Sequence, residues 1–197
     1  MKNIIILACL FAITGCSQRQ VSREEWLSMT TRTFPGTTVE TVLKTGDQVL
    51  HFSDQSDVTV SHSENKIMAY RKFMIYAVLS ATMGRYELDL QATQKGQDVE
   101  TKLEITRSFS AVFGPEMKDP WKWREAHDLF YNRMEALLYG KQWLTCSEAE
   151  DKAESGWFLE PLCLLADDKI PASGVKLSDY AKAELQGQLE FEKQQGL

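Results

Sequence analysis

The sequence predicts an α+β domain in which helices pack on an antiparallel sheet. Three observations support this fold class: an apolar pattern at helical spacing comes first, runs that alternate apolar and polar residues follow, and a longer helical pattern comes after them. Alternation along a strand implies that one face lies on a core while the other faces water, which favours antiparallel pairing. Helices and sheet would then form two layers around one core.

Two helices are predicted before the strands. Ser22, followed three residues later by Glu25, forms a capping box and predicts a short helix that Pro35-Gly36 ends. A second capping box over 37–40 begins a helical pattern that extends to Phe52 and includes Gly46 on its apolar stripe. Because glycine there costs about 1 kcal/mol relative to alanine, we expect close packing of this helix against the sheet.

An antiparallel sheet of about four strands is predicted in the middle of the chain. The run over 58–62 alternates, and a turn at Glu64-Asn65 leads into an aromatic and β-branched run over 67–81. The part of that run after Phe73 is also compatible with a helix. The clearest feature is a hairpin, with strands over 86–92 and 99–105 joined at the turn 95–97.

The longest helix is predicted near 119–140. Asp119 is a candidate N-cap, and the missing N–H of Pro120 costs nothing in a first helical turn. The buried stripe includes Phe130 and Met134, and Gly140 ends the helix. A mostly polar helix over 177–193 forms a C-terminal helical tail. The order of these elements is similar to the helix-grip layout of some envelope lipoproteins, a similarity that rests on element order alone.

The N-terminus has the pattern of a secretory signal. Lys2 precedes an apolar run over 4–13, and its length of about ten residues fits a signal peptide but not a spanning helix. The segment Ile13-Thr14-Gly15-Cys16 resembles the lipobox of bacterial lipoproteins. That resemblance implies cleavage before Cys16, a lipid on its sulfur and an acylated new N-terminus. The alternative is an ordinary cleaved signal, with Cys16 present by chance.

The resemblance to lipoproteins also implies a location. In lipoproteins an aspartate directly after the lipidated cysteine favours the inner membrane, whereas Ser17 stands here. We therefore expect an outer-membrane protein that is held through the lipid on Cys16, with its domain facing the periplasm. The chain divides into a signal peptide (1–15), a lipidated tether with a short helix (16–36), an α+β core (37–143) and a disulfide-closed segment with the C-terminal helix (144–197).

The remaining cysteines predict a disulfide. Cys9 leaves with the signal peptide and Cys16 carries lipid, so Cys146 and Cys163 remain in an oxidising compartment. Closing a loop of that length stabilises the fold by about 3 kcal/mol in the chain-entropy model. The alternative is two buried free thiols. Because the spacing is not Cys-x-x-Cys, neither a thioredoxin-like centre nor a zinc site is indicated.

The charge of the chain disfavours nucleic acid as a partner. The formal net charge is −6 and no basic block occurs, so we expect protein partners and mild repulsion from anionic lipid headgroups. No HExxH, Gly-x-Ser-x-Gly, Walker or Gly-x-Gly-x-x-Gly motif occurs. The sequence therefore assigns no catalytic, cofactor-binding or metal-ligating residue.

Two weaker patterns have a functional and an ordinary structural interpretation. His62 and Glu64 would share one face of a strand and could bind a metal or exchange protons, but a solvated strand end is the better interpretation. Trp121 and Trp123 could stack on a sugar or a partner, but packing at the start of a helix is the better interpretation.

The expected function is that of a non-catalytic protein-interaction module in the bacterial envelope. Such lipoproteins serve as accessory parts of assembly, secretion or conjugation machines, or as exclusion and immunity factors. The alternative is a ligand-binding protein or enzyme with a pocket between sheet and helices. In that case the residues of interest are Tyr70, Tyr76, Trp123 and His62.

Overall fold

The protein has the predicted α+β fold. A computed structural model describes residues 19–53, 58–77, 80–111 and 115–163, so the signal segment, Cys16 and the predicted helix over 177–193 lie outside the described residues. Along the chain the elements are α2 (Arg23–Thr30), β1 (Thr31–Phe34), α3 (Val39–Ser53), β2 (Val58–Ser63), β3 (Lys66–Ala77), β4 (Ser80–Lys95), β5 (Asp98–Ala111), β6 (Met117–Pro120), α4 (Arg124–Tyr139), α5 (Cys146–Glu150), η2 (Gly156–Leu159) and α6 (Glu160–Cys163).

In the described part of the chain, six antiparallel strands form the sheet in the order β1-β5-β4-β3-β2, with β6 also paired to β5. β1 pairs with residues 99–102 of β5 and β6 with residues 106–109. In the gap between them, the N–H of Leu103 donates to the Tyr131 hydroxyl at 3.1 Å, and the N–H of Trp121 donates to the carbonyl of Ile105 at 2.7 Å. These two bonds satisfy backbone groups that no strand pairs.

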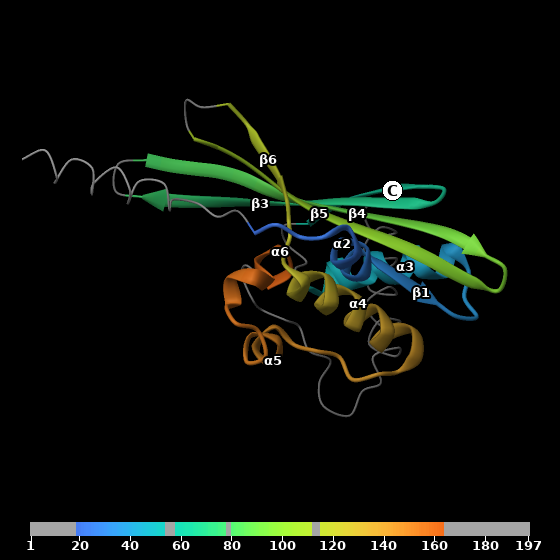
Figure 1. The fold of residues 1–197 in the computed structure, drawn as a ribbon. Helices are drawn as coiled ribbons and strands as arrows, with labels where there is room; N and C mark the ends of the chain where they lie inside the picture. The colour runs from blue at the N-terminus through green and yellow to red at the C-terminus, as the bar shows by residue number, and fades with distance from the viewer. Residues whose placement is uncertain (1–18, 54–57, 78–79, 112–114, 164–197) are drawn as a thin grey trace, which may run out of the picture.

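Helices α3 and α4 cover one face of the sheet (Figure 1). The layer between them is filled by apolar side chains, and Phe130 and Met134 of α4 are fully buried against Leu90 and its neighbours. Gly46 gives α3 its close approach, since a Cβ atom there would lie 2.6 Å from Cδ2 of Leu90. The close packing expected at Gly46 is confirmed.

Three of the local signals for helix ends and turns are confirmed, but two are wrong. α2 ends at Thr30 rather than at Pro35-Gly36, because β1 follows it, and the side chain that caps α3 is that of Thr38 rather than Thr37. The Ser22 hydroxyl accepts the N–H of Glu25 at 3.1 Å at the start of α2. Gly140 ends α4 in the left-handed conformation, with φ of 68°. The turn at Gly96 also has a positive φ of 66° and joins the predicted hairpin strands.

The strand predictions need three corrections. β1 and β6 were not predicted, so the sheet has six strands among the described residues rather than about four. Each of these two has four residues, which is too short for alternation to stand out. The chain after Phe73 continues β3 as a strand and does not form a helix, because it pairs with β4 along its whole length. Strands β4 and β5 also extend well beyond the predicted 86–92 and 99–105.

The predicted start of the long helix is wrong. Asp119 and Pro120 end β6, and α4 begins at Arg124 after Trp123, whose side chain makes no capping hydrogen bond. The proline signal was misleading because a proline is also tolerated at the end of an edge strand, where its missing N–H breaks no ladder bond.

The predicted disulfide between Cys146 and Cys163 is present, with a Cα–Cα distance of 5.8 Å. Thr145 and Glu148 form a capping box at the start of α5. The segment is held to the sheet by the Tyr86 hydroxyl, which donates to the carboxylate of Glu160. The disulfide-closed segment therefore packs as part of the same core.

Candidate interaction face of the sheet

The sheet face opposite α3 and α4 carries no helix in the described part of the chain (Figure 1). We call it the open face. Because side chains alternate along each strand, every second residue of β3, β4 and β5 points there. The open face is defined by Met68, Tyr70, Met74, Met83, Arg85, Glu87, Asp89, Glu104, Thr106 and, from β6, Lys118.

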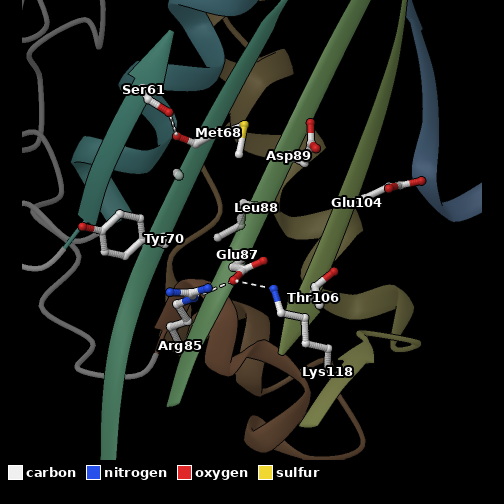
Figure 2. A pocket seen from close by; sticks show the side chains of 11 residues that line it. Ser61, Met68, Tyr70, Arg85, Glu87, Leu88, Asp89, Glu104, Thr106 and Lys118 are labelled. Atoms are coloured by element: carbon white, nitrogen blue, oxygen red, sulfur yellow. Dashed lines mark hydrogen bonds and ion pairs between the residues drawn. The ribbon is translucent and has the colours of Figure 1, made fainter. Parts of the chain in front are cut away.

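The open face contains a shallow hollow of about 460 Å³. Residues of β2, β3, β4, β5 and β6 line it, and Figure 2 shows Tyr70 on one side and Lys118 on the other. Both apolar and charged side chains line the hollow. A surface of this kind resembles the mixed composition of protein-binding sites more than the enclosed apolar pockets that small ligands use.

An ion network crosses the centre of the open face. Glu87 of β4 accepts from Nε of Arg85 at 2.5 Å and from Nζ of Lys118 at 3.4 Å (Figure 2). The hydroxyl of Ser108 donates to the same carboxylate oxygen at 3.3 Å. The network links β4, β5 and β6, since Ser108 and Lys118 lie 21 and 31 positions from Glu87 in the sequence.

The network holds Glu87 in its charged form. Desolvation by burial acts to raise the pKa of Glu87, but the hydrogen bond and charge of Arg85, together with Lys118, outweigh it and leave the pKa below its ordinary value. The same contact with Glu87 raises the pKa of Arg85. Both groups therefore stay ionised at neutral pH, and their charges are available to a partner.

Beside the network, the open face exposes large apolar side chains. Exposure ranges from 37% for Tyr70 to 52% for Met68, and Met74 and Met83 lie directly opposite each other on neighbouring strands. Methionine is flexible and polarisable, so it adapts to irregular apolar partners. A band of such residues next to ordered charges can provide both contact area and register to a bound protein.

His62 lies on β2, whereas Glu64, with which it was expected to share a strand face, follows β2 in a turn. Nε2 of His62 lies 3.8 Å from the carboxylate of Asp47 on α3, and Nδ1 of His51 lies 3.2 Å from the same oxygen. The hydrogen bond with Asp47 raises the pKa of His51 to about 8, although burial acts against it. Within residues 19–53, 58–77, 80–111 and 115–163, no group of histidine, cysteine and carboxylate side chains could hold a metal ion.

The other side chains that the sequence analysis singled out lie in different parts of the fold. Tyr70 lies on the open face, whereas the side chain of Tyr76 is outside the described residues. Trp121 is buried, with its indole N–H donating to the carbonyl of Phe158 at 3.2 Å. Trp123 stacks on the ring of Phe158 with 4.1 Å between centroids. Both tryptophans serve packing, as the sequence interpretation favoured.

Sequence reasoning missed most residues of the open face. Their alternation with buried residues predicted that they face water, but it could not show that Arg85, Glu87 and Lys118 meet. The charge pattern Arg-x-Glu at 85–87 was a weak sign, since residues two apart on a strand share a face.

The comparisons with known proteins do not assign the chain to a family. Neither a protein family nor a curated protein sequence matches the chain. Among solved structures, the chain is similar to the crystal structure of a DUF4468 family protein from Bacteroides ovatus, with 16% identity and a TM-score of 0.35, over 57% of this chain and 86% of that one. In the part of the chain that the structure describes, no helix has the length and apolar character needed to cross a membrane.

Proposed function

We propose that the protein is a lipoprotein anchored to the outer membrane through Cys16, and that its open face binds another envelope protein in the periplasm. The binding role rests on the band of exposed apolar side chains beside the Arg85–Glu87–Lys118 network. The anchor and the location rest on the lipobox at 13–16 and on Ser17. The function is non-catalytic, as an accessory part of an envelope machine or as an exclusion or immunity factor.

The packing of the helices supports binding over catalysis. A ligand-binding protein or enzyme of the alternative kind needs a pocket between sheet and helices, but Phe130 and Met134 are fully buried there and Gly46 brings α3 into contact with Leu90. No observation on the described residues favours the alternative specifically.

Photo-crosslinking in cells tests the binding face. A photoreactive amino acid replaces Met68 or Met83 on the open face, or Lys141 after α4 as a matched exposed control. We expect the two open-face positions to form one discrete adduct with another envelope protein, and the control to form none. Equal adduct patterns at all three positions, or no adduct at any, would reject the open face as the binding surface.

Intact mass tests the anchor separately. Membrane-extracted protein should lack residues 1–15 and carry three acyl chains, and Cys16→Ser should abolish both features. A mature mass without lipid would remove the anchor and leave a freely diffusing periplasmic protein.

A further inference from the structure

The described chain enters the domain beside a group of tryptophans. The guanidinium of Arg19 lies 4.8 Å from the ring centroid of Trp123, and its Nη2 donates to the carboxylate of Glu25 at 2.7 Å. These two contacts hold Arg19 against the folded domain. Cys16 precedes Arg19 by three residues, a separation that spans at most about 11 Å even when fully extended. A lipid on Cys16 would therefore bring the membrane surface to this part of the domain.

Trp157 exposes its ring at this place. It lies 5.0 Å from the ring of Trp121 and 5.7 Å from that of Trp123, yet it remains 40% exposed while the neighbouring Leu159 is buried. An adjoining hollow of about 320 Å³ is lined by Trp123, Trp157 and the basic side chains of Arg19, Arg107 and Lys122. We call these five residues the anchor patch.

The local charge at the anchor patch is opposite to that of the whole chain. Two adjoining hollows there are lined by four cationic side chains and one acidic side chain, namely Arg19, Arg23, Arg107, Lys122 and Asp119. The chain as a whole carries a net charge of −6. Glu25 offsets the charge of Arg19, so Arg23, Arg107 and Lys122 carry most of the local excess.

Arg107 is oriented by aromatic rings. Its guanidinium centre lies 5.1 Å from the ring of Phe73 and 5.2 Å from that of Phe109. Its Nε atom is buried and has no hydrogen-bond partner within the described residues. The two rings therefore orient the guanidinium at the hollow, where its positive charge can attract a phosphate oxygen.

We propose that the anchor patch rests on the surface of the membrane that carries the anchor, with the exposed ring of Trp157 among the headgroups and the cations of the patch paired with lipid phosphates. This inference rests on the proposed lipid anchor at Cys16. Tryptophan is favoured at the level of the headgroups, and basic side chains attract an anionic lipid surface. The contact would orient the domain, because Thr106 of the open face and Arg107 of the patch are neighbours on β5 and point to opposite faces of the sheet.

Quenching of tryptophan fluorescence tests the contact. The full lipoprotein is purified and reconstituted into vesicles of equal amounts of phosphatidylcholine and phosphatidylglycerol, in which the acyl chains carry bromine as a quencher. Trp157→Phe removes the exposed indole but keeps an aromatic ring, and Trp143→Phe is the matched control at a ring that packs on Phe52. We expect Trp157→Phe to lose most of the lipid-dependent quenching and Trp143→Phe to retain it. Equal quenching in both variants would overturn the proposal.

Charge reversal provides the second test. Lys122→Glu should shift the balance from docked to undocked domain by about fivefold or more, because each basic residue near an anionic surface contributes about that factor. Lys44→Glu on α3 makes the same change of charge outside the patch and should leave the quenching unchanged. The same loss in both variants would mean that the total charge, and not the patch, controls the contact, and would overturn the proposal.

The intact mass of the same preparation separates this inference from the proposed function. If Cys16 carries no lipid, the anchor fails, and flotation of the unlipidated protein with phosphatidylglycerol vesicles then tests the patch alone. Flotation that Lys122→Glu abolishes and Lys44→Glu preserves would uphold the patch without the anchor. No flotation of the unlipidated wild type would overturn it.

Discussion

Replacing Tyr131 by phenylalanine tests how the gap along the edge of β5 is closed. The Tyr131 hydroxyl is fully buried, donates to the carbonyl of Thr30 at 2.7 Å and accepts from the N–H of Leu103 at 3.1 Å. It also lies 3.4 Å from the hydroxyl of Thr101. One side chain therefore joins α4 to the end of α2 and to the part of β5 that no strand pairs.

The expected cost follows from the groups that lose their partner. Phenylalanine preserves the ring, so no cavity forms, but Leu103 N–H and Thr30 C=O are left buried without this bond. An unsatisfied buried polar group costs about 1 to 3 kcal/mol. Since neither residue is accessible to water, we expect Tyr131→Phe to lower the free energy of unfolding by about 2 kcal/mol or more, at least about 1 kcal/mol for each of the two groups.

Urea unfolding at equilibrium measures this loss, with the disulfide intact and with Tyr139→Phe as the control. The Tyr139 hydroxyl donates to the carbonyl of Pro35 at 3.2 Å, but the residue is 42% exposed, so water can replace the bond. The control should cost less than about 1 kcal/mol. If Tyr131→Phe and Tyr139→Phe lose the same free energy of unfolding, the account of the β5 edge is wrong.

Three further predictions concern the core. Replacing both Cys146 and Cys163 with alanine should lower the free energy of unfolding by about 3 kcal/mol; a loss near zero in urea unfolding would contradict this. Gly46→Ala should lower the melting temperature, because overpacking against Leu90 costs about 1 to 3 kcal/mol and outweighs a helix-propensity gain of about 1 kcal/mol; a higher melting temperature would refute it. Burial lowers the pKa of His127 to about 4. As the pH falls, this imidazole is therefore protonated in the unfolded chain at a higher pH than in the folded protein. Stability should therefore fall by about 3 kcal/mol from pH 6.5 to 4, and His127→Gln should flatten this fall in urea titrations at each pH. Equal slopes would exclude His127 as the cause.

The open face shows which features of a site can be predicted from the sequence and which cannot. Alternation along β4 and β5 predicts which side chains face water, since the period of two is a property of each strand alone. It does not predict that Lys118 of β6 completes the network around Glu87, because β6 is too short to be recognised and its pairing depends on the register with β5. The composition of the open face was therefore predictable strand by strand, but the assembled network was not.

The sequence by itself determined the features whose causes are local. The cap at Ser22, the helix end at Gly140 and the hairpin turn at Gly96 depend on a few neighbouring residues, and the structure has all three. Tertiary structure alone decided the pairing of β1 with residues 99–102 and the conversion of Asp119-Pro120 into the end of a strand. The physical reason is that an edge strand of four residues is stabilised by partners distant in the chain, whose backbone groups it satisfies, and not by its own sequence pattern.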